Sequence, residues 1–437
     1  MKSIMRLMLL VILALGVALP IAAQDKQPEA IQKLSLSDCV KLALANNRQI
    51  LQGKEMLNGT DAKIDEYKSY LYPHLQIDAN YARLGKVPEY MGFKMASANN
   101  YSYKATVSQL LYAWGKVDKG IALSQAEVEM VKGTVSLTEQ EISFAVIGFF
   151  YHLLTVQESI KVIDENVSLL EQQLDMLRKK FEQGEVSDFD ILSIEVQVSM
   201  LKGQRLDTVN NLRKMKLQFN LVIGRAVETE VELEGFLDHE MITPDEKNAL
   251  NEALANRIEI RQIMNKTEIA QLQKDLAAAS NKPNLNAFAN WELKNGYQPN
   301  MNDLQGAWTF GAMISFPLFD GWRTDAQVRQ AGANINAIKI EYEQKKQEIS
   351  VEVRQAVLDI ESSWQKIKIG ELTIDRAEKA YKIAEERFKN GLASTLDLLN
   401  AQSNMTNARL NLLQSVYNYS LSKYSLDKAV GKQILAN

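Results

Sequence analysis

The stretch "FKNGLASTLDLLN" (Phe388–Asn400) has a near-copy, "FEQGEVSDFDILS" (Phe181–Ser193), 207 residues earlier in the chain. In each stretch a glycine follows a phenylalanine by three residues and interrupts a long helical pattern. An aspartate then follows the glycine by six residues. A glycine is the residue preferred just beyond a helix end, and an aspartate is favoured beside the start of the next helix. The two stretches therefore predict two sharp turns between long helices.

The whole chain repeats itself in the same way. "ALANNRQI" (43–50) resembles "ALANRIEI" (253–260), and "LYPHLQIDANY" (71–81) resembles "NKPNLNAFANW" (281–291), both at an offset of 210. Further on, "VSQLLYAWGK" (107–116) resembles "ISFPLFDGWR" (314–323) at an offset of 207. The first copy therefore carries three additional residues between about Arg83 and Tyr101. Such order and spacing indicate a tandem duplication, with repeats at 24–240 and 241–437.

Heptad patterns predict long coiled-coil helices in both repeats. Apolar residues spaced by seven predict one helix over 117–181 and a second over 323–389, each about 100 Å long. Helices over 189–223 and 395–430 follow the two turns, and a helix of about 50 Å over 37–70 precedes the first strands. In the second repeat, small residues occupy half of the seam, which predicts a closer approach of the neighbouring helix. This half of the seam begins at Ile349 and continues with the small residues Ala356, Ser363, Gly370, Ala377 and Ala384.

Two predicted β-hairpins, at 72–112 and 284–319, carry strands that alternate apolar and polar residues over about ten positions. Strands of this length cross a bilayer when they are tilted. A soluble sandwich face alternates in the same way, so the pattern alone leaves both readings open. Aromatic residues near the loop ends of the strands resemble an interfacial girdle, and they are Tyr81, Tyr101, Tyr103, Trp291 and Trp308.

Four strands cannot close a barrel, and an open sheet edge in lipid leaves backbone groups unpaired. Two copies would supply eight strands, and the side chains inside such a narrow barrel would fill it. Three copies would supply twelve strands, which can enclose water. A channel built from this sheet therefore favours a trimer.

The ends and the composition limit the class of protein. Residues 1–23 read as a secretory signal, with Lys2 and Arg6 before a short apolar run and small residues at Ala22 and Ala23. The single cysteine, Cys39, excludes an internal disulfide and is expected to be buried on an amphipathic helix. The net charge is −4 without basic runs, so we expect no nucleic-acid partner.

An enzyme is not indicated. The three histidines, His74, His152 and His239, fall in a strand, a coiled-coil helix and an acidic linker. The sequence shows no nucleophile–histidine set, no metal-ligand spacing and no phosphate-binding loop. We therefore expect neither a cofactor nor a metal site.

The combined features resemble the TolC-like outer membrane efflux proteins. The most specific segments are "LSLSDCVKLALANN" (34–47), "SFPLFDGWR" (315–323) and the two turns quoted first. The resemblance implies a mainly α fold with a β-barrel contribution. Long antiparallel coiled-coil helices would form an α-barrel, with four transmembrane strands per chain and an internal two-fold repeat. It also implies a homotrimer in the outer membrane whose periplasmic end engages an adaptor protein and, through it, an inner-membrane pump.

The residues that hold the inner end of the channel closed in this family are matched only in part by this sequence. Asp190 matches an acceptor aspartate, and Asp397 matches the first acid of a ring around the pore. Phe388 stands where the family has a tyrosine, Ala393 where it has an arginine, and Asn400 where it has a second ring acid. Closure is therefore expected to depend on packing of Phe388 and Leu392 or on other polar pairs.

The turns are also the expected docking sites for the adaptor. Gly184 and Gly391 would turn the chain, and small Ser187, Ala393 and Ser394 would leave room for the partner. Ser187 or Asp188 is predicted to cap the following helix, which would leave Asp190 free to face the lumen. A ring of three Asp397 carboxylates would favour cations.

One other class of protein stays open, a soluble periplasmic coiled-coil adaptor or scaffold. Adaptors also contain helical hairpins, but a duplication of both hairpin and helix is not expected of them. The linker at 225–240 is acidic and is predicted to form a small belt around the helices. The cargo depends on partners that this sequence does not encode.

Overall fold

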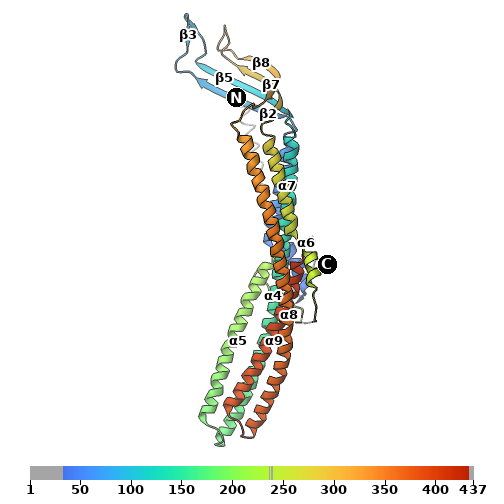
Figure 1. The fold of residues 1–437 in the computed structure, drawn as a ribbon. Coiled ribbons are helices and arrows are strands. Elements are labelled where there is room, and N and C mark those ends of the chain that lie inside the picture. The colour runs from blue at the N-terminus through green and yellow to red at the C-terminus, as the bar shows by residue number, and fades with distance from the viewer. Residues whose placement is uncertain (1–32, 236, 238–239, 433–437) are drawn as a thin grey trace.

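The computed structural model describes residues 33–235, 237 and 240–432, and the predicted signal segment 1–23 lies outside these residues. The chain forms an elongated rod of helices, with a β-sheet at one end and, at the other end, the two turns at which the chain reverses between long helices (Figure 1). The rod bends near its middle, where the short helices and the linker gather. We call this region the waist.

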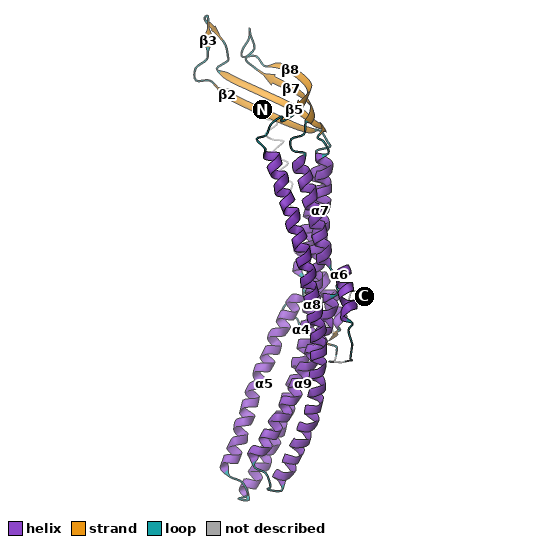
Figure 2. Cartoon of the chain, viewed as in Figure 1, coloured by secondary structure: helices purple, strands orange, loops and turns teal. Residues whose placement is uncertain are grey.

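The helices follow the order of the two repeats. The first repeat contains α2 (Leu36–Asn46), α3 (Arg48–Ser69), α4 (Lys116–Glu182) and α5 (Asp188–Val222). The second contains α6 (Glu246–Asn256), α7 (Ile258–Ala278), α8 (Arg323–Lys389) and α9 (Thr395–Ala429). The two longest helices, α4 and α8, have 67 residues each, so each is about 100 Å long (Figure 2).

The long helices pack side by side in a single curved layer. Between the waist and the turns the order is α5, α4, α9, α8, and between the waist and the sheet it is α3, α4, α7, α8. The small residues of the second repeat do allow close packing, because a Cβ atom added to Gly370 would lie 3.0 Å from Leu412 Cδ1 of α9. The two edges of the layer are α8 on one side and α5 with α3 on the other, and α6 packs against α8 only at the waist.

The prediction of one continuous helix over 37–70 is wrong. The chain leaves helical geometry for one residue at Asn47, with ψ 128°, so that α2 and α3 are separate helices. The second repeat breaks in the same way at Arg257, with ψ 129°, between α6 and α7. Each break faces the C-terminal end of α5 or α9, which lead back from the turns and which we call the return helices. The last carbonyl groups of a helix have no partners within it, so they need donors from elsewhere.

Each break binds the end of a return helix. Asn47 Nδ2 donates to the carbonyl of Val222 at 2.8 Å, at the end of α5. At the equivalent place in the second repeat, the Arg257 guanidinium donates to the carbonyl of Ala429 at 3.3 Å, at the end of α9. Arg257 is almost fully buried and is neutralised by ion pairs with Glu259 and Glu352.

A glycine allows each of these close approaches. Gly224, with φ 74°, follows α5, and a Cβ atom on it would lie 2.5 Å from the carbonyl oxygen of Asn46. Gly431, with φ 76°, follows α9, and its Cβ would lie 3.0 Å from the carbonyl carbon of Asn256. The two return helices therefore stop against the breaks, and α5 with α3 covers the length of α4.

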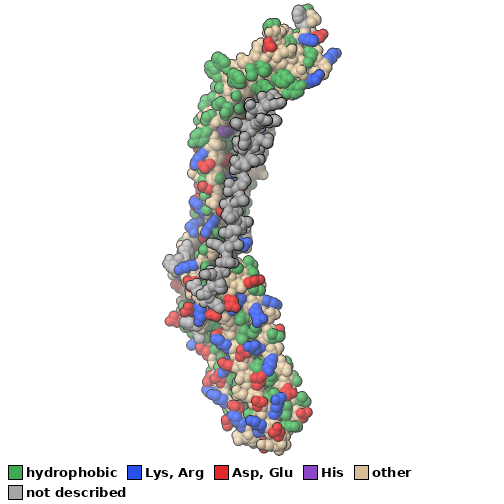
Figure 3. Space-filling model, turned by 180° about the vertical axis from the view of Figure 1, so that it is seen from behind, with side chains coloured by type: hydrophobic (Ala, Val, Ile, Leu, Met, Phe, Trp, Pro, Cys, Tyr) green, Lys and Arg blue, Asp and Glu red, His purple; other side chains and the backbone are tan. Residues whose placement is uncertain are grey.

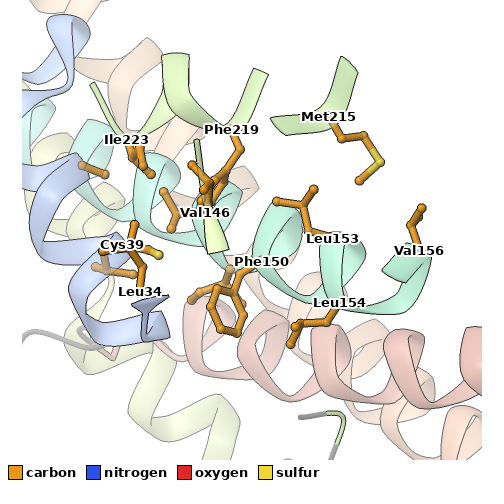
Figure 4. Close-up of a cluster of buried hydrophobic side chains, with 14 residues drawn as sticks. Leu34, Cys39, Val146, Phe150, Leu153, Leu154, Val156, Met215, Phe219 and Ile223 are labelled. Carbon is orange, nitrogen blue, oxygen red and sulfur yellow. The ribbon is translucent and has the colours of Figure 1, made fainter. Parts of the chain in front are cut away.

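The waist also holds a buried apolar cluster around Cys39, which the structure buries as the sequence predicts (Figure 4). Side chains of α2, α4 and α5 meet there. The linker contributes β6 (Glu232–Leu233), which pairs in parallel with β1 (Lys33–Leu34). Val231, before β6, is 1% exposed, so this part of the linker packs into the waist.

The four-stranded sheet is antiparallel throughout, in the order β2 (His74–Arg83), β5 (Asn99–Tyr112), β7 (Asn284–Lys294), β8 (Gln305–Ser315). A short hairpin, β3 (Glu89–Tyr90) and β4 (Phe93–Lys94), extends the loop between β2 and β5. This loop contains the three additional residues of the first copy.

The register places the apolar residues of all four strands on one face. Ile77 pairs with Ala105, Ala105 with Trp291, and Trp291 with Trp308. On the other face Asp78 pairs with Lys104, and Lys104 pairs with Glu292. Phe288 interrupts the polar face, but its ring lies over Gly311, which has no side chain to displace it. Figure 3 shows hydrophobic side chains gathered at the sheet end of the molecule.

By length and composition, α4 is the one described helix that is apolar enough to cross a membrane. This evidence is weak, since the core helices of soluble proteins pass the same test. Val146, Ile147 and Leu153 of α4 are completely buried in the waist cluster. The apolar stretch of α4 is therefore the core of the helical layer.

The waist predicts which glycine is most sensitive to substitution. Gly224→Ala would place a side chain in a left-handed conformation, at about 1–2 kcal/mol, and also against the backbone of α2. Gly184→Ala is the matched control, because its φ is 76° and nothing lies within 4 Å of the added Cβ. We expect Gly224→Ala to lower the Tm of the full chain in detergent clearly more than Gly184→Ala does. Equal shifts would contradict the close packing at the waist.

Candidate functional site

The two turns at the end of the rod share one backbone design. After α4, the amide of Gly184 donates to the carbonyl of Phe181 and the amide of Glu185 donates to that of Lys180, at 2.9 and 3.0 Å. After α8, the amides of Gly391 and Leu392 donate in the same way to Phe388 and Arg387. Both glycines have positive φ, 76° and 71°. Each long helix thus ends in a Schellman motif, with its last carbonyl groups satisfied.

The recurring aspartate belongs to a capping box at the start of the return helix. The Ser187 amide donates to Asp190 Oδ2 at 3.1 Å, and the Asp190 amide donates back to Ser187 Oγ at 3.3 Å. Ser394 and Asp397 form the same reciprocal pair at 3.0 and 3.1 Å. Ser187, one of the two predicted candidates, is the N-cap, but the expectation that Asp190 stays free is wrong, since its carboxylate closes the box.

Asp190 also joins the two repeats. Hydrogen bonds from the side chains of Ser187 and then of Thr395 hold the pKa of Asp190 below its ordinary value. Thr395 opens α9 and is 4% exposed, whereas Asp190 is partly exposed, so this contact links the two turns near the surface of the chain. For Asp397, the side chain and backbone of Ser394 are the main causes that lower the pKa, and Arg387 contributes a smaller Coulombic part.

Phe388 and Leu392 lie in different environments. Phe388 is 6% exposed and packs in the apolar cluster of the hairpins, with the ammonium of Lys180 5.6 Å from its ring centroid. Leu392 is 67% exposed, so it makes little contact within one chain. Phe388 of the second repeat therefore packs against the first repeat, and its ring also contacts the ammonium of Lys180 from that first repeat.

Further polar pairs join the repeats above the turns. Gln402 Nε2 donates to Asn166 Oδ1 at 2.6 Å, and Gln173 Nε2 donates to the hydroxyl of Tyr381 at 3.1 Å. Both pairs are buried. Sequence reasoning did not find Thr395, Lys180 or these amides, because the pairs join helices about 200 residues apart and leave no local signal.

The other predicted turn residues lie on the surface of the chain. Asp397 and Asn400 are exposed on the first turns of α9, and Gly184, Ser187, Gly391 and Ser394 are exposed around them. Ala393 is partly covered. The end of the rod is therefore a mixed surface made of both repeats, where these polar and small residues lie beside the exposed side chains of Phe189, Leu392 and Leu396.

The aromatic residues of the sheet form two bands. The predicted band lies toward the loops, where the tilted rings of Tyr81 and Tyr101 have centroids 5.1 Å apart and Trp291 pairs with Trp308. A second band, missed by sequence reasoning, lies where the strands meet the helices. All its members are exposed, and they are Tyr72, Tyr112, Trp114, Phe319 and Trp322.

The backbone at the second band is unusual. Trp114 and Gly115 have φ values of 52° and 73°, and Gly321 and Trp322 have 67° and 65°. A tryptophan in this conformation costs about 1–2 kcal/mol, so the geometry is imposed by the turn from strand to helix. Aromatic bands at both ends of ten-residue strands are typical of a bilayer-spanning sheet.

No group of His, Cys, Asp and Glu side chains that could hold a metal ion occurs within the described part of the chain. The polar face of the sheet nevertheless carries charge. Glu292 accepts a hydrogen bond from Ser102 Oγ at 3.1 Å and pairs with Lys294 at 3.2 Å. Such side chains require water or partners, so the two faces of the sheet suit different surroundings.

The capping boxes give a prediction with a pH dependence. Ser187→Ala should destabilise the first turn of α5 by about 1 kcal/mol, seen as faster amide hydrogen exchange there. The lowered pKa of Asp190 means that the box is intact at neutral pH and is lost as pH falls below about 3.8 through the folded-state pKa. The difference between variant and wild type should therefore shrink in acid.

Ser193→Ala is the control for this measurement. Ser193 lies one turn further along α5, and its hydroxyl donates only to the carbonyl of Phe189 in the preceding turn. We expect it to exchange like the wild type. A Ser187→Ala variant with unchanged exchange would rule out the box as a stabilising element.

Comparisons with known proteins agree with this architecture. The family model described as "Outer membrane efflux protein" matches residues 39–216 and 249–432. The alkaline protease secretion protein AprF of Pseudomonas aeruginosa is 23% identical over 327 residues, covering 73% of this chain and 67% of that protein. The outer membrane protein TolC of Escherichia coli is 21% identical over 424 residues, covering 91% of this chain and 85% of that protein.

Solved structures show the same fold. The outer membrane channel CmeC of Campylobacter jejuni superposes with a TM-score of 0.78 at 17% identity, covering 91% of this chain and 85% of that one. The outer membrane protein VceC of Vibrio cholerae superposes with a TM-score of 0.75 at 17% identity, covering 91% and 96%. The matched segments include both repeats, both turns and the four-stranded sheet, and the chain belongs to the outer membrane efflux protein family.

Proposed function

We propose that three copies of this outer membrane channel protein close into one duct, which carries substrates from a periplasmic adaptor and an inner-membrane pump to the exterior. The observation that carries the proposal is the four-stranded sheet, with one continuous apolar face and two unpaired edges. The described residues cover neither edge.

The sheet can close only through other copies of itself. Because the four strands alternate in direction, β8 of one copy would run antiparallel to β2 of the next. Closure removes the unpaired edges that a bilayer does not tolerate. Three copies supply twelve strands, with the apolar face toward lipid and the charged face toward a water-filled interior.

The edges of the helical layer support the same arrangement. On α5, exposed apolar residues follow a helical spacing at Phe189, Leu192, Val196 and Met200. On α8, a second exposed apolar stripe contains Val351, Leu358, Ile369, Leu372 and Ile383. The stripes lie on opposite edges of the layer, so contact between them is head-to-tail and closes into a ring.

The turns would lie at the periplasmic end of this duct. Their exposed small residues, Gly184, Ser187, Gly391 and Ser394, together with the partly covered Ala393, offer the surface for the adaptor. The contacts of Asp190 with Thr395 and of Phe388 with Lys180 would hold the two hairpins together in the resting state. They take the place of the tyrosine and arginine contacts that the resemblance would otherwise imply.

The location and assembly can be tested together. Cells are fractionated, and the membrane protein is run on denaturing gels with and without heating. A heat-sensitive trimer in the outer membrane, conducting ions in planar bilayers, is the expected result. A soluble periplasmic monomer would instead support the adaptor or scaffold alternative.

A charge in the α8 stripe should break the assembly. Ile369→Lys places an ammonium where we expect apolar contact with the α5 stripe of a neighbouring copy, and the trimer band should be lost or reduced at least tenfold. Lys382→Glu is the control, because Lys382 is exposed on α8 outside the stripe. An undiminished trimer in Ile369→Lys would exclude this face as the interface.

Asp397 should set the response of the duct to multivalent cations. Three copies would bring three exposed Asp397 carboxylates around one axis, where lanthanum ions would bind and block current. Asp397→Asn should weaken this block of single-channel current at least tenfold. Asp190→Asn is the control, since Asp190 faces Thr395 of the other repeat. Unchanged block in Asp397→Asn would remove Asp397 from the pore.

A further inference from the structure

A pocket of about 570 Å³ lies where the sheet meets the helices, at the start of α4 and between the two repeats. It is bounded by the ends of α3 and α7, the start of α4 and the adjoining ends of β2, β5 and β7. Its apolar and aromatic lining includes Tyr67, Tyr70 and Leu276. Its polar lining includes Lys116, Asn284 and Asn286.

The charge in this pocket is one-sided. Its lining includes one lysine and one histidine, Lys116 and His74, and no carboxylate. Lys116 Nζ donates to Asn284 Oδ1 at 3.4 Å, and it forms no ion pair with the described residues. The pocket therefore combines an ammonium, three carboxamides and aromatic rings, which together suit an anion with an apolar body.

The second repeat shows what the first one lacks. At the position equivalent to Ala113, the second repeat has Asp320, beside Arg323 in place of Lys116. Asp320 Oδ2 accepts hydrogen bonds from the amide and the hydroxyl of Thr324, at 2.9 and 2.5 Å. Thr324 Oγ1 in turn lies 2.9 Å from Ser280 Oγ.

These three polar positions are replaced together in the first repeat. Asp320, Thr324 and Ser280 correspond to Ala113, Val117 and Tyr70, and all three of the latter line the pocket. The second repeat thus has its own carboxylate, Asp320, at this junction of strand and helix, and hydrogen bonds with Thr324 hold that carboxylate in place. The first repeat keeps the basic residue and has an apolar pocket in place of the carboxylate and its partners.

We propose that this pocket binds a small amphiphilic carboxylate, with the carboxylate at Lys116 and the apolar body against Tyr67, Tyr70 and Val117. His74 and Ser108 of the lining belong to the charged face of the sheet, which faces the interior in the proposed duct. The inference rests on the proposed function in one respect. The bound molecule would be a passing cargo molecule at the junction of barrel and helices.

The test uses the full-length trimer in non-ionic micelles, titrated by calorimetry with 2-naphthoate against micelle blanks. Wild-type protein should bind 2-naphthoate, and the neutral 2-naphthamide should bind at least tenfold more weakly. Lys116→Gln should weaken naphthoate binding about tenfold, because a charge-assisted contact is lost. Ala113→Asp supplies the carboxylate of the second repeat and should abolish binding.

Arg323→Gln is the matched control, since it removes the equivalent cation at the start of α8, which does not line the pocket. It should bind naphthoate like the wild type. Equal affinities for wild type and Lys116→Gln, or no difference between naphthoate and naphthamide, would overturn the proposal. A wild-type trimer that conducts in bilayers but does not bind naphthoate would overturn the pocket alone and leave the channel function standing.

Discussion

The structure depends on how two short helices meet end to end beside each 67-residue helix. A helix end that meets another helix inside a protein must satisfy its last carbonyl groups and leave space for the approaching backbone. The chain solves both problems at the waist in each repeat. A single non-helical residue donates to the carbonyl at the end of the return helix, and a glycine in left-handed conformation allows backbone contact. With this joint, α4 and α8 are covered along their whole length.

The joint decides where the functional ends of the molecule lie. Because the long helices run without a break, the turns after Gly184 and Gly391 lie at one end of the rod and the sheet at the other. Each end is built from both repeats. The turns are linked by Asp190 with Thr395 and by Phe388 with Lys180, and the sheet is linked by the pairing of β5 with β7. The duplication thus supplies matching halves, and the contacts between them produce the site.

The two copies have since diverged where they meet different surroundings. Asn47 and Arg257 occupy equivalent breaks. The buried guanidinium of Arg257 needs the carboxylates of Glu259 and Glu352 to balance its charge, whereas the neutral amide of Asn47 needs no counter-charge. At the junction with the sheet, Asp320 and its hydrogen bonds in one copy correspond to Ala113 and a pocket in the other. Differences of this kind are visible only when the repeats are aligned and the contacts are known.

The sequence by itself determined the elements whose signals are local and periodic. Heptads indicate the long helices, alternation indicates the strands, and the repeated glycine and aspartate mark the turns, because each pattern reports which face of an element is buried. The helix break at Asn47 was missed, since one extended residue barely disturbs an apolar pattern. The expectation that Asp190 is free was wrong, because an aspartate at the third helical position closes a capping box with the N-cap residue, here Ser187.

Only the tertiary structure decided which distant residues meet. The pairs of Asn166 with Gln402 and of Gln173 with Tyr381 lie more than 200 residues apart in the chain, and such partners are chosen by the register of packed helices. The second aromatic band likewise required the geometry of the turns from strand to helix. The sequence therefore specified the parts and their lengths through local periodicity. Packing decided their contacts, since a contact between repeats depends on register and orientation that no single segment encodes.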